Sequence, residues 1–105
     1  MSSPVLNSHQ RAFLKSLAHP LKPVVLVGSD GLTPGLEGAV DRALEDHELI
    51  KVKLGQSFTG ERRSAASSLG AATDAAVVQV IGRMIVLFRP RAGERDGRAR
   101  IELPA

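Results

Sequence analysis

The chain has 105 residues, of which 43% are hydrophobic and 24% are charged, and its formal net charge is +3. This length predicts one domain, and the composition is that of an ordinary folded protein, which excludes global disorder. The absence of cysteine excludes disulfides, thiolate nucleophiles and cysteine-bound zinc. The longest apolar runs, residues 24–27 and 84–88, are too short to span a bilayer, and residues 1–10 lack the features of a signal peptide. We therefore expect a small cytoplasmic protein with no membrane partner.

Basic and acidic side chains are unevenly distributed along the chain. Residues 1–29 carry three basic side chains and no acidic one, residues 30–48 carry six acidic and one basic, and residues 49–105 carry ten basic and five acidic. A chain with one acidic helix and basic flanks can present a positive face, which favours polyanions such as nucleic acid. A solvated surface with scattered charges explains the same composition equally well.

Ser8–Ala18 is predicted to form the first helix, because its apolar residues recur at helical spacing and Ser8 can act as the N-cap. His19-Pro20 ends this helix, since the residue before a proline is driven out of the α region. Residues 24–27 form a continuous apolar run, which predicts a strand buried on both faces. That run opens directly into a tight turn with the sequence Gly28-Ser29-Asp30-Gly31.

Thr33-Pro34 predicts the N-cap and the first residue of a second helix. The apolar face of this helix extends over residues 36–47, and acidic side chains occupy the opposite face. In Leu49–Leu54 apolar residues alternate with Lys51 and Lys53, which is typical of a half-buried strand. The two ammonium groups would then face solvent or a ligand.

Residues 55–60 are predicted to form a loop, and residues 61–69 a third helix that buries little and ends near Gly70. Two β runs follow, residues 77–81 and 84–88, separated only by Gly82-Arg83. Glycine at the first central position indicates a two-residue type II′ hairpin. This turn would pair Val80 with Ile85, and Val78 with Leu87.

The predicted order of elements is α-β-α-β-α-β-β. Two strand–helix–strand crossovers imply neighbouring or near-neighbouring parallel strands, and the hairpin adds an antiparallel one. The predicted fold is therefore α/β (α+β), one domain over residues 1–90 with a four-stranded mixed sheet covered by helices. Residues 91–105 are predicted to be a charged tail, either mobile or docked as a short edge strand through Ile101 and Leu103.

The turn Gly28-Ser29-Asp30-Gly31 is the most informative local feature for function. Its two glycines would let a phosphate approach the backbone closely, and the helix that follows would point its free N–H groups at the same place. A GxxG loop clamps a nucleic-acid backbone in KH-type domains, although many tight turns have the same sequence pattern. Because the turn is neither a GxGxxG fingerprint nor a Walker A loop, no nucleotide cofactor is predicted.

Three lysines are candidate phosphate contacts near this turn. Lys51 and Lys53 are the stronger candidates, because strand alternation places both on one face, although lysines also protect edge strands. Lys22 lies two residues before the first predicted strand, from which its ammonium could reach a phosphate near the turn.

Four arginines and one aromatic residue extend this set. Arg62 and Arg63 begin the third helix, where the helix dipole disfavours cations, which hints at a use for them. Arg83 lies at the tip of the hairpin and Arg89 closes it, and both are either nucleic-acid contacts or plain solvated turn residues. Phe58, in a loop beside basic residues, is the candidate platform for base stacking.

Enzymatic functions find little support in the sequence. The three histidines, His9, His19 and His47, are not at metal-ligand spacing, and His47 is expected to be packed or to cap its helix. Asp41 and Glu45 form an exposed i, i+4 pair, which is more typical of a solvated helix face than of an acid–base couple. No GxSxG-type motif supports a serine nucleophile. We therefore predict no enzyme, no metal and no cofactor.

Four stretches of the sequence together carry a family resemblance. They are Leu17-Ala18-His19-Pro20-Leu21-Lys22-Pro23-Val24-Val25, Gly28-Ser29-Asp30-Gly31-Leu32-Thr33, His47-Glu48-Leu49-Ile50-Lys51-Val52-Lys53, and Val78-Gln79-Val80-Ile81-Gly82-Arg83 continuing to Leu87-Phe88-Arg89-Pro90. In order and spacing these stretches resemble the YhbY family between Leu6 and Pro90. That family comprises the bacterial single-domain members of the CRM (chloroplast RNA splicing and ribosome maturation) group.

The resemblance implies an RNA-binding module associated with assembly of the large ribosomal subunit. It also implies a fold similar to the C-terminal domain of translation initiation factor three, a mixed sheet with helices. The GxxG loop of the family corresponds to Gly28, Ser29, Asp30 and Gly31. Asp30 is acidic where many CRM domains carry a basic residue, and Phe88 stands where a tyrosine is common.

We therefore expect a monomeric, non-enzymatic protein that binds structured ribosomal RNA. Its glycine turn and second helix would hold a phosphate and its basic residues the backbone, so binding would weaken steeply with salt. The alternative is a protein–protein adaptor of ribosome assembly that uses the acidic second helix, and an enzyme acting on RNA comes third. The predicted RNA-binding residues are Gly28, Ser29, Asp30, Gly31, Lys22, Lys51, Lys53, Arg62, Arg63, Arg83 and Arg89.

Overall fold

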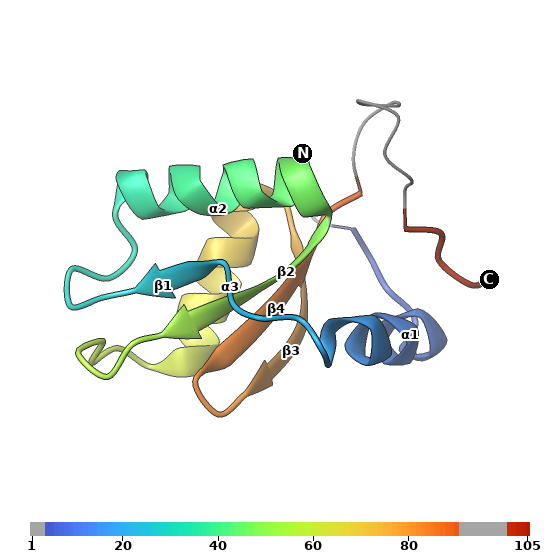
Figure 1. The fold of residues 1–105 in the computed structure, drawn as a ribbon, viewed down its shortest axis with the longest axis horizontal. Coiled ribbons are helices and arrows are strands. Elements are labelled where there is room, and N and C mark those ends of the chain that lie inside the picture. Colours follow the sequence, from blue (N-terminus) through green and yellow to red (C-terminus); the bar gives the residue numbers. More distant parts are fainter. Residues whose placement is uncertain (1–3, 91–100) are drawn as a thin grey trace.

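The computed structural model describes residues 4–90 and 101–105. Two helices, α2 and α3, cover one face of a four-stranded sheet, and α1 packs on the other face at one end (Figure 1). The order and the mixed sheet confirm the predicted fold class. The elements are α1 (Ser8–Ala18), β1 (Val25–Val27), α2 (Pro34–His47), β2 (Leu49–Leu54), α3 (Arg62–Thr73), β3 (Ala76–Ile81) and β4 (Met84–Phe88).

The sheet has the strand order β1-β2-β4-β3. β1 and β2 are parallel neighbours, and β4 is antiparallel to both β2 and β3. β2 and β3 therefore run in the same direction with β4 between them, which confirms the parallel relationships predicted from the two crossovers. As a result the carboxyl ends of β1, β2 and β3 lie at the end of the sheet where α2 and α3 begin.

Two hydrophobic clusters lie on opposite faces of the sheet. The cluster beneath α2 and α3 is centred on residues such as Leu44 and Leu69, and the cluster beneath α1 includes Leu14 and Phe88. β2 contributes to both clusters, because successive side chains of a strand point to opposite faces. Phe88 is 1% exposed, so the ring that replaces the family's common tyrosine is a core element.

The helix α1 has the predicted bounds but a different N-cap. Asn7, rather than Ser8, caps the helix, and Ser8 is its first residue. The Asn7 side chain accepts a hydrogen bond from the Gln10 backbone N–H at 2.8 Å, and the Gln10 side chain accepts one from the Asn7 backbone N–H at 3.1 Å. This reciprocal pair is a capping box, and the residue three positions after the cap decides between the two adjacent candidates.

The strand β1 is an edge strand with one exposed face, which corrects the prediction that it is buried on both. Val27 is fully buried in the cluster beneath α2 and α3. Leu26 points to the opposite face and is 62% exposed, because α1 packs at the other end of that face (Figure 1). The continuous apolar run therefore predicted the strand correctly, but it did not show whether both faces of the strand are covered.

The helix α3 is longer and better buried than predicted. It continues past Gly70 to Thr73, and Asp74 takes the left-handed C-cap conformation with φ 56° that a glycine was expected to supply. Ala65, Ala66 and Leu69 are buried against the sheet. Gly70 is a close-approach residue: a Cβ built on it would lie 2.9 Å from the Ala75 carbonyl oxygen and 3.1 Å from Val77 Cγ2.

The Gly70→Ala variant is therefore expected to lower the free energy of unfolding by about 1–3 kcal/mol, because the overpacking exceeds the gain of about 1 kcal/mol in helix propensity. Gly38→Ala in α2 is the matched control, since its Cβ would meet only the movable Arg42 guanidinium, at 3.4 Å. In that control the free energy of unfolding is expected to rise by about 0.5–1 kcal/mol. Urea denaturation of both variants measures the difference, and stabilisation by Gly70→Ala would contradict the packing argument.

The hairpin between β3 and β4 has the predicted turn but a shifted register. Gly82 has φ 58° and Arg83 does not have a positive φ, as a type II′ turn requires. Val80 pairs with Ile85 as predicted, but Leu87 pairs with Val77 rather than with Val78. A β-bulge between residues 77 and 79 absorbs one residue and turns Val78 into the cluster beneath α1. Arg11 from α1 donates hydrogen bonds to the carbonyls of Val77 and Val78 at this bulge.

Residues 101–105 pack against the cluster beneath α1 and form no strand. The Ile101 backbone N–H donates to the carboxylate of Glu48 at 2.7 Å, and the Gln10 side chain donates to the Pro104 carbonyl at 3.0 Å. Glu48, at the junction of α2 and β2, is 1% exposed and has φ 65°. The prediction for residues 91–100 lies outside the described residues.

Candidate nucleic-acid interface

The glycine turn between β1 and α2 is exposed to solvent. Gly28, Ser29 and Asp30 are exposed, and the Gly31 backbone N–H donates to the Gly28 carbonyl at 3.1 Å, which closes the turn. Gly31 has φ 71°, a conformation that favours glycine. Thr33 caps α2 as predicted, accepting from the Leu36 N–H at 3.1 Å. The turn and the amino end of α2 are therefore open to a ligand.

The loop of residues 55–60 lies against the glycine turn. The Gly55 N–H donates to the Val27 carbonyl at 2.8 Å, and Phe58 Cε1 lies 3.9 Å from the position of a Cβ on Gly31. The Phe58 ring is partly buried and packs against the cluster beneath α2 and α3. Phe58 therefore packs beneath the two loops, and its role as a platform for base stacking stays a prediction.

Arg83, at the hairpin tip, holds the same loop. Its guanidinium donates to the carbonyls of Leu54 at 2.9 Å, of Phe58 at 3.1 Å and of Gly55. Arg83 is therefore not a plain solvated turn residue. Its guanidinium satisfies backbone acceptors and so joins the hairpin tip to the loop of residues 55–60.

The amino end of α3 also lies at this end. Glu61 caps the helix, accepting hydrogen bonds from the backbone N–H groups of Ser64 at 2.8 Å and Arg63 at 3.1 Å. These bonds favour the carboxylate and lower the pKa of Glu61. Arg62 donates to the Gly82 carbonyl at 2.8 Å, whereas Arg63 is exposed and its side chain forms no hydrogen bond or ion pair within residues 4–90 and 101–105.

Lys51 and Lys53 lie on the sheet face that α1 partly covers, as strand alternation predicted. Lys53 is exposed near the carboxyl end of β2. Lys51 is half-buried, and its ammonium donates to the His19 carbonyl at the end of α1, at 3.1 Å. Lys51 therefore also satisfies a helix C-terminus, where a cation is favourable.

Lys22 lies near the carboxyl end of α2, whereas the glycine turn precedes the amino end of that helix. It lines an apolar groove of about 560 Å³ together with His47, the last residue of α2. Because α2 is 14 residues long, its two ends are separated by about 20 Å. The structure therefore does not place the Lys22 ammonium near the turn. His47 is exposed, and the C-cap of α2 is Glu48, so the packed or capping role predicted for His47 is also corrected.

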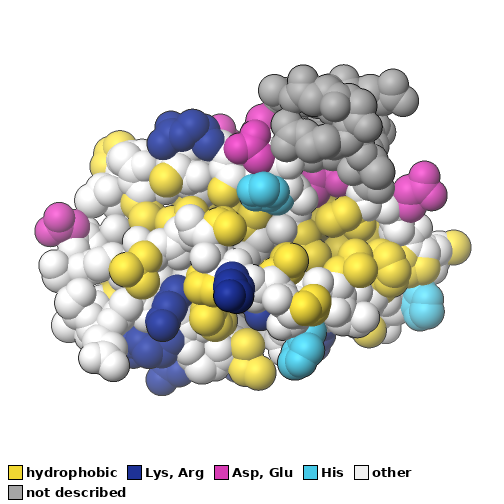
Figure 2. Space-filling model, in the orientation of Figure 1, with side chains coloured by type: hydrophobic (Ala, Val, Ile, Leu, Met, Phe, Trp, Pro, Cys, Tyr) yellow, Lys and Arg dark blue, Asp and Glu magenta, His cyan; other side chains and the backbone are white. Residues whose placement is uncertain are grey.

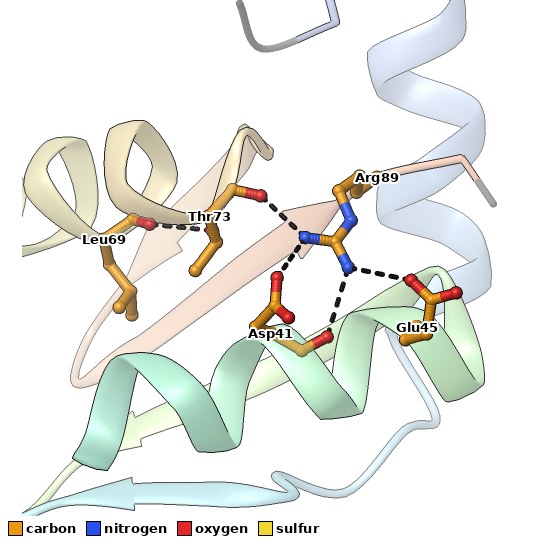
Figure 3. A network of polar contacts seen from close by, with 5 residues as sticks. All are labelled: Asp41, Glu45, Leu69, Thr73 and Arg89. Atoms are coloured by element: carbon orange, nitrogen blue, oxygen red, sulfur yellow. Dashed lines mark hydrogen bonds and ion pairs between the residues drawn. The ribbon is translucent and has the colours of Figure 1, made fainter. Parts of the chain in front are cut away.

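Arg89 is part of an internal network rather than a solvated residue (Figure 3). Its guanidinium contacts the Asp41 carboxylate at 2.6 Å, the Thr73 carbonyl at 2.8 Å and the Glu45 carboxylate at 3.4 Å. Asp41 and Glu45 are therefore ion-paired, which corrects their prediction as a simply solvated pair. The network joins α2, the end of α3 and the end of β4.

The structure thus brings together part of the predicted set. We call residues 28–31, 55–63 and 82–83 the loop end. It contains the glycine turn, Arg62, Arg63 and Arg83, and Lys53 lies next to it, whereas Lys22 and Arg89 lie elsewhere. Within residues 4–90 and 101–105 no group of three metal-ligating side chains occurs, and no helix is long and apolar enough to cross a membrane.

An exposed glycine turn at a helix amino end, flanked by cations on an α+β domain, is an arrangement suited to phosphate contact. The chain belongs to the CRS1/YhbY (CRM) domain family, whose pattern matches residues 6–89. It is 41% identical to an RNA-binding protein of Haemophilus influenzae, over 94% of this chain and 95% of that one. It is 43% identical to a probable RNA-binding protein of Pseudomonas aeruginosa, over 80% and 81% of the two chains.

Comparison with solved structures supports the same assignment. The fold matches the solution structure of a Staphylococcus aureus protein proposed to bind RNA, with a TM-score of 0.75. The two sequences are 36% identical, and the match covers 95% of this chain and all of that one.

Proposed function

We propose that this protein binds RNA through the loop end. The observation that carries the proposal is the exposed glycine turn at the amino end of α2, with Lys53, Arg62 and Arg63 at the same end of the sheet. Backbone N–H groups and the positive end of the helix dipole favour a phosphate there. The relatives named as RNA-binding proteins support this function.

We further propose that the RNA is ribosomal and that binding assists assembly of the large ribosomal subunit without catalysis. This step depends on family membership. The contacts available at the loop end are to the backbone, which positions a protein on folded RNA but reads little sequence. A specific partner would then be selected by the shape of the RNA.

Removal of two exposed cations tests RNA binding. The double variant Lys53→Gln/Arg63→Gln is expected to weaken binding to a structured rRNA fragment and to lower the slope of log affinity against log salt by about 0.7–0.9 per lost phosphate contact. Lys15→Gln with Arg42→Gln removes the same charge from exposed positions on α1 and α2 and is the matched control. Filter binding over a salt series measures both. Binding that is absent at low salt, or equal losses in both double variants, would contradict the proposed interface.

A further inference from the structure

Part of the sheet face that carries α1 is not covered by that helix (Figure 1). The strand registers align Leu26, Lys53, Met84 and Ile81 side by side across all four strands, and we call these four residues the open row. The next aligned set, which includes Lys51 and Val86, borders α1, and Val86 is 1% exposed in the cluster beneath that helix. The helix α1 therefore borders the set that contains Val86 but does not cover the open row, which is the next aligned set along the strands.

The open row contains two large apolar side chains that are exposed to solvent. Leu26 is 62% exposed and Ile81 is 58% exposed, and these two form the ends of the row. Figure 2 looks onto this side of the molecule, where hydrophobic side chains lie beside a group of lysine and arginine side chains at the lower left. Four strands at a spacing of about 4.8 Å make the row about 14 Å long.

The charge of this face has one sign. Lys53 stands inside the open row, Lys51 stands in the set beside it, and none of the described residues at these register positions is acidic. The two outer residues of the open row are each followed in the chain by a segment of the loop end. Leu26 is two residues before Gly28, and Ile81 immediately precedes Gly82. A ligand held at the glycine turn would therefore extend over the open row.

We propose that the open row binds the bases of unpaired nucleotides adjacent to the RNA backbone held at the loop end. This inference rests on the proposed function and specifies the class of RNA. A duplex buries its base faces in the stack and presents phosphates and hydroxyls, which gain little from aliphatic side chains. Unpaired nucleotides offer flat apolar faces on a polyanionic backbone, which match both the apolar ends and the lysines of this surface.

The double variant Leu26→Ser/Ile81→Ser tests the proposal. The probes are an RNA hairpin of about ten base pairs with blunt ends and the same hairpin with an unpaired extension of about six nucleotides. The wild type is expected to bind the extended probe at least about fivefold more tightly, and the variant is expected to lose this preference while binding the blunt hairpin unchanged. The salt slope is expected to stay the same, because neither substitution removes a charge.

The control variant is Val5→Ser/Leu21→Ser, which removes two exposed apolar side chains outside the open row and is expected to keep the preference. Thermal unfolding verifies that all three proteins are folded. A wild type that binds both probes equally, or a Leu26→Ser/Ile81→Ser variant that retains the preference, overturns this inference while RNA binding itself stands. Equal binding of both probes by the wild type would assign the open row to another partner, such as a protein. Absence of binding to either probe contradicts the proposed function.

Discussion

Replacing Arg89 by methionine is expected to lower the free energy of unfolding by about 2–4 kcal/mol, since charge-assisted hydrogen bonds are lost and their acceptors are left behind. The Arg89 side chain is 18% exposed and contacts Asp41, Glu45 and the Thr73 carbonyl. That carbonyl belongs to the last turn of α3, where no intrahelical donor is available. Methionine preserves the apolar stem but supplies no donor. Urea denaturation measures the loss.

Arg42→Met is the control for this variant, because Arg42 is exposed on the same helix that carries Asp41. Its free energy of unfolding is expected to fall by no more than about 0.5 kcal/mol. A double-mutant cycle with Asp41→Asn isolates the ion pair, and non-additivity is expected because the two groups lie 2.6 Å apart. If Arg89→Met unfolds at the same urea concentration as Arg42→Met, the network does not stabilise the fold.

This network changes how the adaptor alternative has to be tested. Reversing the charge of Asp41 or Glu45 would place a cation against Arg89, so a lost protein contact could reflect destabilisation rather than a lost partner. Glu37, in the first turn of α2, lies outside the network and is the better position for a charge change. The adaptor function itself stays a prediction.

The features predicted correctly from the sequence depend on neighbouring residues. Leu49–Leu54 alternates because one strand has two faces, Thr33-Pro34 starts α2 through a cap and a preset φ, and Gly82 supplies the positive φ of the hairpin. Asn7 carried a readable signal as well, since Gln10 completes its capping box. Local chemistry decides these features, so a single sequence reveals them.

The features that were missed depend on contacts between distant residues. Gly70 lies inside α3 at a point where the backbone of Ala75 approaches it closely, and the bulge near Val78 lets that side chain join the cluster beneath α1. The helix propensity of glycine and the alternation of a strand contain no information about either neighbour. Leu26 shows the same limit, because its exposure depends on where α1 packs.

The candidate site also contains features that depend on neighbouring residues and features that depend on distant ones. The exposed turn at Gly28 was predictable, because a strand, two glycines and a helix cap follow one another in sequence. The roles of the arginines were not, because Arg83 and Arg89 bind acceptors from segments 16 or more residues away, as the Arg89–Thr73, Arg83–Phe58 and Arg89–Asp41 contacts show. A count of basic residues cannot separate arginines that hold the fold from cations that are free to meet a phosphate.

Arg83→Met is expected to lower the free energy of unfolding by about 2–3 kcal/mol, because three backbone carbonyls lose a charged donor. Arg83→Lys keeps the charge but lacks the planar fork, so it is expected to recover only part of the loss. Arg63→Met is the matched control, since that exposed side chain forms no hydrogen bond or ion pair within the part of the chain that the structure describes. It is expected to change the free energy of unfolding by about 0.5 kcal/mol or less.

RNA affinity of the same variants separates positioning from direct contact. If Arg83 acts by holding residues 55–60 beneath the glycine turn, Arg83→Lys weakens RNA binding despite its unchanged charge, and amide hydrogen exchange accelerates in that loop. If Arg83 instead acts only as a phosphate contact, Arg83→Lys binds nearly as well as the wild type and exchange in the loop is unchanged. We expect the first result, because the guanidinium donates to the carbonyls of Leu54, Gly55 and Phe58 and so holds this loop through hydrogen bonds within the protein.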